Sequence, residues 1–166
     1  MKGQGEAIIF ILLLIISIFL FASATMWSRG IFEENLGFAV LEASEKFMKE
    51  LDNEISNIIK FGGVKEIEYN LGGTIELFNE TTIEIRTPIS LELTENWVNI
   101  SENGSFIRER KDGETLVLQL LYPEREYKVE FFTEGPRLAQ PEYIRLERNS
   151  TDFTTTTVIK IKISFV

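Results

Sequence analysis

The feature that most constrains this chain is an uncharged apolar run close to its N-terminus. Residues 7 to 27 read AIIFILLLIISIFLFASATMW, which is 21 residues without a charged side chain. A helix of that length spans about 30 Å, the thickness of the hydrocarbon core of a bilayer. The run predicts a helix that enters a membrane, and it excludes a single soluble domain built from all 166 residues.

Charge divides the chain at the same place. The first 30 residues carry two basic side chains, Lys2 and Arg29, and one acidic side chain, Glu6, so the net charge of −9 leaves −10 on the other 136 residues. The basic flank favours a cytoplasmic N-terminus and an exported acidic domain. An acidic domain argues against nucleic-acid binding, which needs a basic surface. Cleavage as a secretory signal peptide at the small residues 22 to 24 is the alternative to a retained helix.

The residues before the apolar run carry a family resemblance. Lys2-Gly3-Gln4-Gly5-Glu6 directly precedes the run, and it resembles the class III signal sequence of archaeal type IV pilin-like proteins. The resemblance implies that a prepilin peptidase cuts between Gly3 and Gln4 and that the hydrophobic helix stays on the mature protein. It also implies that this helix packs on the helices of like subunits in a filament.

Glu6 has two interpretations. In the family, a Glu at the fifth mature position is thought to pair with the amino terminus of a neighbouring subunit during assembly, whereas Glu6 would be the third mature residue. The other interpretation is an ordinary acidic residue in the first helical turn, where the helix dipole favours an anion. Both interpretations require a partner or water, because an unpaired carboxylate at the edge of the hydrocarbon is costly.

Beyond the apolar run, helical periodicity continues as far as Gly62-Gly63, where we expect the helix to end. Apolar side chains form one stripe of an amphipathic helix: Leu36, Val40, Ala43, Phe47, Leu51, Ile55 and Ile58. We expect residues 47 to 60 to pack on the chain's own downstream domain, whereas the first half of this extension has no obvious cover. Gly30 and Gly37 are weak points at which the helix can kink.

From Val64 onward the apolar period changes from 3.6 to two, which predicts strands. About eight short alternating segments are separated by turns; they include 67–71, 75–77, 83–85, 91–93, 116–120, 127–131, 144–146 and 159–165. The predicted fold class is α+β, a long N-terminal hydrophobic-to-amphipathic helix followed by an all-β antiparallel sandwich-like head. We expect Trp97 and the other aromatic residues of the head in its core rather than on a ligand platform.

The predicted organisation has four parts: a leader at 1–3, a transmembrane or filament-core helix at 4–28, an amphipathic extension at 29–62 and an extracellular domain at 63–166. The extracellular part holds four Asn-x-Ser/Thr sequons, at Asn79, Asn99, Asn103 and Asn149. The chain's composition gives about one sequon by chance. The excess predicts an exterior, glycosylated surface and agrees with the orientation inferred from the charges.

The composition offers little for catalysis. Cys and His are both absent, which excludes disulfides, thiolate nucleophiles, Ser-His-Asp triads and imidazole metal ligands. The carboxylates lack calcium-loop spacing, and phosphate loops and nucleophile elbows are missing. We therefore predict no enzyme activity, no cofactor and no metal.

The resemblance implies a structural subunit, major or minor, of an archaeal type IV pilus-like surface filament. Its partners would be the membrane, the prepilin peptidase and like subunits. The chain would first be membrane-inserted and would then lie on the cell surface, where its head could serve adhesion. The alternative is a single-pass, membrane-anchored extracellular protein that binds a partner or the envelope, such as an archaellum accessory protein, and never polymerises.

Overall fold

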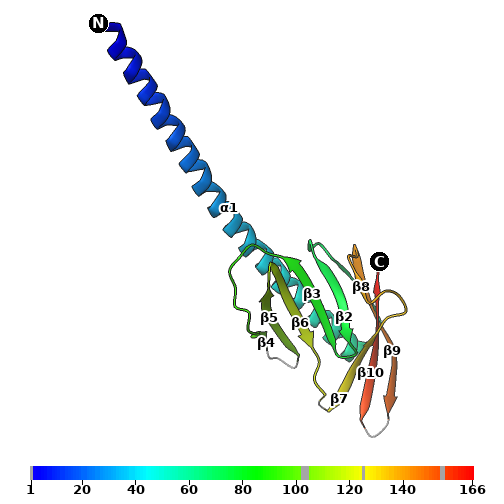
Figure 1. Ribbon diagram of the computed structural model, residues 1–166. Helices are drawn as coiled ribbons and strands as arrows, with labels where there is room; N and C mark the ends of the chain where they lie inside the picture. The colour runs from blue at the N-terminus through cyan, green and yellow to red at the C-terminus, as the bar shows by residue number, and fades with distance from the viewer. Residues whose placement is uncertain (1, 102–104, 125, 154–155) are drawn as a thin grey trace.

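The computed structural model describes residues 2–101, 105–124, 126–153 and 156–166, with side chains from residue 8 onward. A single helix, α1 (Lys2–Phe61), contains 60 residues, which corresponds to about 90 Å. Its C-terminal half lies against a head of strands, and its N-terminal half projects away from that head (Figure 1). The α+β class and the sandwich-like head that the sequence predicts are confirmed.

The helix ends at the predicted glycines. The backbone N–H of Gly62 donates to the carbonyl of Ile58 at 2.8 Å, and Gly62 and Gly63 have φ angles of 71° and 95°. Glycine adopts this left-handed conformation without the steric cost that a Cβ brings. The helix runs continuously through Gly30 and Gly37, so neither position kinks it (Figure 1).

The described strands form two sheets. The first has the order β1-β9-β10-β7 and consists of β1 (Val64–Glu68), β9 (Tyr143–Phe153), β10 (Thr157–Phe165) and β7 (Tyr127–Phe132). The second has the order β4-β5-β6-β3-β2-β8 and consists of β4 (Val98–Ser101), β5 (Phe106–Asp112), β6 (Thr115–Leu121), β3 (Thr82–Pro88), β2 (Thr74–Asn79) and β8 (Leu138–Ala139). Backbone hydrogen bonds from Phe131 N to Glu80 O (2.7 Å) and from Leu77 N to Arg137 O (2.8 Å) join adjacent parts of the head.

One strand pair departs from the predicted antiparallel arrangement. Strands β7 and β10 are parallel, with Val129 opposite Ile159 and Phe131 opposite Ile161. Parallel neighbours need a long crossover connection, and the chain supplies it through β8 and β9. The alternation of apolar and polar residues within a strand shows which face of the strand is buried. It does not show which strand lies beside it or in which direction that strand runs, so the sequence could not predict this crossover.

The core forms around the distal half of α1. Phe47, Met48, Leu51, Ile55 and Ile58 are all buried, together with the inward rows of both sheets. The predicted packing of residues 47 to 60 on the head is therefore confirmed. Burial does not extend along the whole predicted stripe, because Leu36 and Ala43 are exposed.

One aromatic contact and one polar contact link the helix with the head, and a second aromatic contact joins the segment after β6 to β7. The rings of Phe47 and Tyr69 meet edge to face with centroids 5.3 Å apart, and those of Tyr122 and Phe131 do so at 5.5 Å. The buried hydroxyl of Tyr122 donates to the carboxylate of Asp52 on α1. Such contacts fix the rotation of the helix within the head.

Two further sequence predictions for the head are wrong. Leu91 and Leu93 belong to a loop between β3 and β4, not to a strand, and Leu91 is buried because it packs beside Gly37 of α1. Trp97 lies outside the core and is half-buried over the guanidinium groups of Arg108 and Arg110, at 4.4 and 4.7 Å from its ring centroid. Cation–π contact with β5 takes the place of core packing for this ring. The prediction that the aromatic residues of the head lie in its core also fails for Phe78, Tyr127, Tyr143 and Phe153, which are exposed.

Candidate membrane and assembly surface on α1

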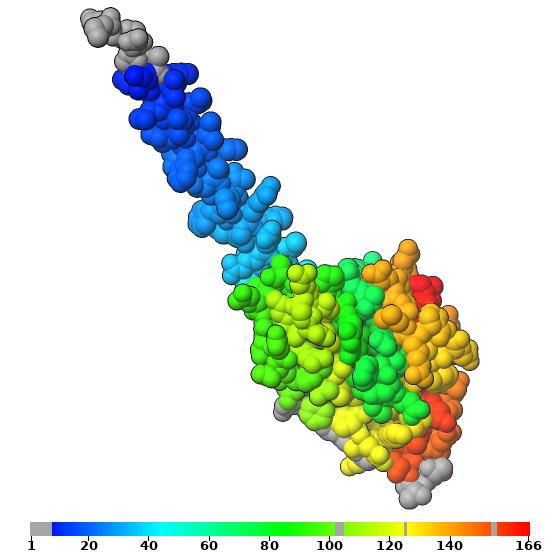
Figure 2. Space-filling view, viewed as in Figure 1, coloured from blue at the N-terminus to red at the C-terminus, as the bar shows by residue number. Residues whose placement is uncertain are grey.

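The projecting half of α1 is an uncovered apolar surface. Every large hydrophobic side chain from Ile8 to Phe21 is at least 45% exposed, and the most apolar stretch has a mean hydropathy of 2.9 with none of it buried. Soluble monomers rarely expose apolar patches above a few hundred Å². The helix is long and apolar enough to cross a membrane, and Figure 2 shows it protruding from the head.

Two hydroxyl groups in this segment are suited to an apolar environment. Ser17 Oγ donates to the carbonyl of Leu13 at 2.8 Å, and Thr25 Oγ1 donates to the carbonyl of Phe21 at 2.7 Å. These internal hydrogen bonds satisfy the hydroxyl donors of Ser17 and Thr25 without water. The segment can therefore lie against lipid or against another helix.

The exposed apolar surface continues past the uncharged run. Ile31, Phe32, Leu36 and Phe38 are between 41% and 68% exposed. From Ile8 to Phe38 the helix measures roughly 46 Å, whereas a bilayer core is about 30 Å thick. Lipid alone cannot cover this length.

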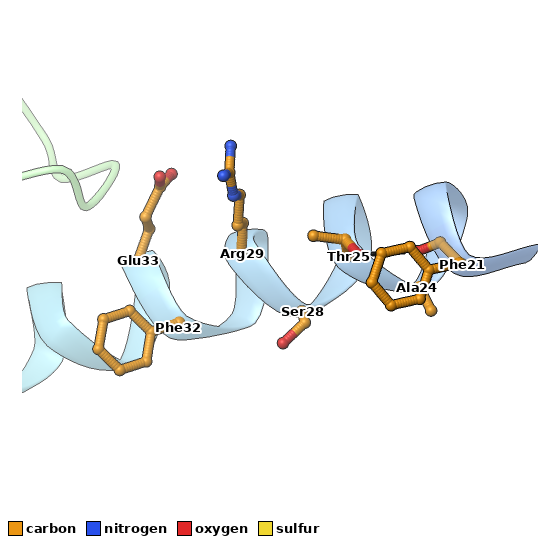
Figure 3. Close-up of a pocket in the computed structure, with 7 residues that line it drawn as sticks. All are labelled: Phe21, Ala24, Thr25, Ser28, Arg29, Phe32 and Glu33. Carbon is orange, nitrogen blue, oxygen red and sulfur yellow. Dashed lines mark hydrogen bonds between the residues drawn. The ribbon is translucent and has the colours of Figure 1, made fainter. Parts of the chain in front are cut away.

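The boundary between the uncharged run and the charged extension is shown in Figure 3. The small residues Ala24 and Ser28 leave a shallow hollow of about 550 Å³ that Phe21 and Phe32 also line. Arg29 projects to the other side of the helix from Ser28 (Figure 3). Arg29 and Glu33 also line this hollow, so charged side chains border the small residues at this boundary.

A second depression lies where α1 enters the head, and we call it the junction groove. Its volume is about 620 Å³. The α1 side and the loop after β3 supply Leu36, Gly37, Val40, Pro88, Ile89 and Ser90, and the charged rim consists of Glu33, Glu92, Lys111 and Glu114. An apolar floor with three carboxylates and one ammonium group favours an apolar segment that carries positive charge.

The groove is held in shape by contacts around it. Ser90 Oγ donates to the carbonyl of Glu33 at 3.1 Å, and Lys111 Nζ donates to the carbonyl of Leu91 at 2.6 Å. A Cβ on Gly37 would lie 3.1 Å from the Cβ of Leu91, so glycine allows the loop to approach the helix closely. Sequence reasoning missed this groove because its walls come from segments far apart in the chain.

The predicted leader residues can be placed only in part. Gly3 and Gln4 lie in the first turn of α1, so the predicted cleavage site directly precedes the exposed apolar surface. The Glu6 side chain is outside the described residues. Both interpretations of Glu6 therefore stay predictions.

The described sequons are exposed. Asn79 ends β2, and its Oδ1 accepts hydrogen bonds from Thr81 N at 2.8 Å and Thr81 Oγ1 at 3.1 Å. Asn99 in β4 and Asn149 in β9 are also exposed, whereas Asn103 lies outside the described residues. Accessibility permits glycosylation at Asn79, Asn99 and Asn149, and their modification stays a prediction.

One buried carboxylate was not singled out from the sequence. Glu84 in β3 is 2% exposed and pairs with Arg86 Nε at 2.6 Å, and it also accepts from Gln119 Nε2. Gln119 Oε1 in turn accepts from Arg108 Nε and Nη2 at 3.0 and 2.8 Å. These groups satisfy one another, so the network holds strands β3, β6 and β5 together.

Burial raises the pKa of three side chains in the head. It raises the pKa of Tyr69 to about 12, and burial followed by the nearby Asp52 raises the pKa of Tyr122. Burial, and then the charge of Glu45 on α1, raise the pKa of Glu109. In the part of the chain that the structure describes, no group of three or more acidic side chains is placed to hold a metal ion.

No protein-family model, curated protein or solved structure matches this chain. The features of the chain that bear on its function are therefore the surface of α1, the junction groove and the N-terminal residues.

Proposed function

We propose that this chain is a structural subunit of an archaeal type IV pilus-like surface filament, assembled through α1 after removal of residues 1–3. The observation that carries the proposal is the length of exposed apolar helix, roughly 46 Å from Ile8 to Phe38. About a third of it extends beyond one bilayer core. Packing against like helices covers both parts with one kind of contact.

The mechanism is assembly rather than chemistry. Lipid tails are as apolar as leucine, so helix association replaces lipid contact by closer packing at small residues such as Ala24 and Ser28. A head-to-tail contact between identical chains that does not close a ring builds an open helical filament. The acidic head then forms the outer surface of that filament.

The second candidate is a single-pass, membrane-anchored extracellular protein that binds a partner or the envelope without polymerising, as an archaellum accessory protein would. One observation favours it: the head already buries its own core on the distal half of α1, so it needs no neighbour to be complete. In this candidate the apolar run is an anchor, and the uncovered residues 31 to 38 contact a different protein.

Sequencing the N-terminus of the native protein tests the proposal. We expect the mature chain to begin at Gln4, and a chain that still begins at Met1 would contradict a processed subunit. Gly3→Val should block processing and filament formation. Gly72→Ala is the matched control, because Gly72 has open space where a Cβ would lie and is far from the leader.

Electron microscopy and mass spectrometry of sheared surface fibres test polymerisation itself. The proposal requires the processed chain in those fibres. Recovery of the chain only as a monomer from detergent-solubilised membranes would favour the anchored protein.

A further inference from the structure

We propose that the junction groove binds residues 29 to 32 of α1 from a second copy of this chain, with Phe32 on the apolar floor and Arg29 at the acidic rim. This inference rests on the proposed filament, because it requires two copies displaced along the helix axis. It specifies which surfaces of the two copies meet, and so deepens that proposal.

The floor of the groove offers space for a large apolar side chain. Leu36 is 55% exposed and Pro88 is exposed, while Val40 beside them is half-buried. Phe32 of the same chain is 68% exposed and precedes Leu36 by one helical turn on a continuous helix. Phe32 is not among the residues that line the groove of its own chain, so the floor is open to a Phe32 side chain from a second molecule.

Charge complementarity also favours residues 29 to 32 as the segment that binds the groove. Arg29 is the only basic residue between Lys2 and Lys46, and the groove rim carries the carboxylates of Glu33, Glu92 and Glu114. The one ammonium group at the rim, that of Lys111, is hydrogen-bonded to a backbone carbonyl at 2.6 Å. The rim is therefore acidic, and Arg29 is the side chain of α1's exposed part that complements it.

Arg29 is available for such a contact. It projects to the same side of α1 as Glu33, one turn away (Figure 3), and no ion pair joins the two within the described part of the chain. A base that precedes an acid by four residues is also the less favourable order for a pair within one helix. Contact with the carboxylates of a neighbouring copy gives this guanidinium group the partner that its own helix does not.

Geometry fixes the arrangement of the two copies. Copies that share a membrane have parallel helices, and a displacement of six residues, about 9 Å, brings Phe32 of one copy between the levels of Leu36 and Val40 of the other. The same displacement brings Arg29 to the level of the rim near Glu33. Repeating this contact from copy to copy is head-to-tail and leaves an open end.

The absence of cysteine from the chain allows a disulfide test in assembled material. In a Phe32→Cys/Val40→Cys chain the two positions are about 12 Å apart on one helix, which is too far for a disulfide within the chain. Oxidation should therefore produce a ladder of linked chains. A Phe32→Cys/Asn53→Cys chain is the matched control, because Asn53 is exposed on α1 outside the groove and should give dimers at most.

Charge reversal in the natural, cysteine-free background is the second test. Arg29→Glu should lower the yield of sheared filaments about fivefold, the change that a loss of about 1 kcal/mol produces. Glu92→Arg combined with Glu114→Arg should restore the yield in the Arg29→Glu chain. If the cysteine chains do not fold, absence of this rescue overturns the inference.

The outcomes separate the inference from the proposed function. Filaments that form normally but give no ladder beyond the control would overturn the groove contact and leave the filament proposal standing. Absence of filaments from the natural chain, together with absence of the ladder, would overturn both.

Discussion

Leu51→Ala and Leu36→Ala make one chemical change at two positions of the same predicted helical stripe. Leu51 is 0% exposed and Leu36 is 55% exposed. At Leu51 the change removes three buried carbon groups, which at about 0.8 kcal/mol each is about 2.4 kcal/mol of transfer free energy. The cavity left in the core adds to this, so we expect a loss of about 3 to 4 kcal/mol in the free energy of unfolding.

At Leu36 the expected loss is below about 1 kcal/mol, because more than half of the side chain is already in contact with solvent. If the head begins to cover α1 only beyond Leu36, the loss in the free energy of unfolding should be about three or more times larger for Leu51→Ala than for Leu36→Ala. The comparison needs no assumption about oligomers when it is made at low concentration in detergent.

The assay is urea unfolding of the full chain in detergent, followed by tryptophan fluorescence. The chain has two tryptophans, so Trp27→Phe leaves Trp97 as the only reporter, and its position over Arg108 and Arg110 makes it sensitive to loss of strand β5. Equal losses for the two leucine variants, or a loss below about 1 kcal/mol for Leu51→Ala, would refute the packing of the head on the distal half of α1.

Three further predictions use the same unfolding assay. Tyr122→Phe removes the hydrogen bond to the Asp52 carboxylate and should cost about 1 to 2 kcal/mol, and an unchanged midpoint would mean that water replaces the bond fully. The raised pKa of Glu109 means that the folded head holds this proton more tightly than the unfolded chain, so stability should fall as the pH rises from the ordinary carboxyl pKa through the raised one. Glu109→Gln should remove that dependence and raise stability at neutral pH, and a parallel pH profile in both chains would contradict this. Gly73→Ala should cost more than about 2 kcal/mol, because its Cβ would lie 2.1 Å from a carbonyl oxygen of β3, whereas Gly72→Ala should cost little.

The local apolar periodicities in the sequence predicted most of the fold. A change of apolar period at Val64 separated the helix from the strands, and Gly62-Gly63 gave the end of the helix, because both features depend on local backbone conformation. The same reasoning failed at Leu91 and Leu93. Leu91 is buried against α1 near Gly37, and Leu93 packs partly buried on the core. Burial in a loop produces the same alternation as burial in a strand.

Contacts between distant segments could not be predicted. Periodicity identified which face of the α1 extension is apolar, but the position where the head starts to cover that face depends on the loop between β3 and β4. The junction groove has walls from α1, from residues 88 to 92 and from the β5–β6 turn, and no single stretch of sequence contains it. The role that we propose for Arg29 and Phe32 could not be predicted from their own segment, because it depends on the junction groove, which distant segments form.

The segment between the uncharged run and the head is the strongest physical argument for a role beyond anchoring. A protein that only had to hold its head near a membrane could join the two by a flexible polar linker, which exposes no apolar surface. This chain instead continues as an uninterrupted helix and exposes Ile31, Phe32 and Leu36 in the gap. A rigid helix fixes the height of the head above the apolar run and its rotation about the helix axis. The uncovered apolar residues favour association with another molecule. Both properties serve a chain whose neighbours must meet it at a defined displacement, and neither serves a tether.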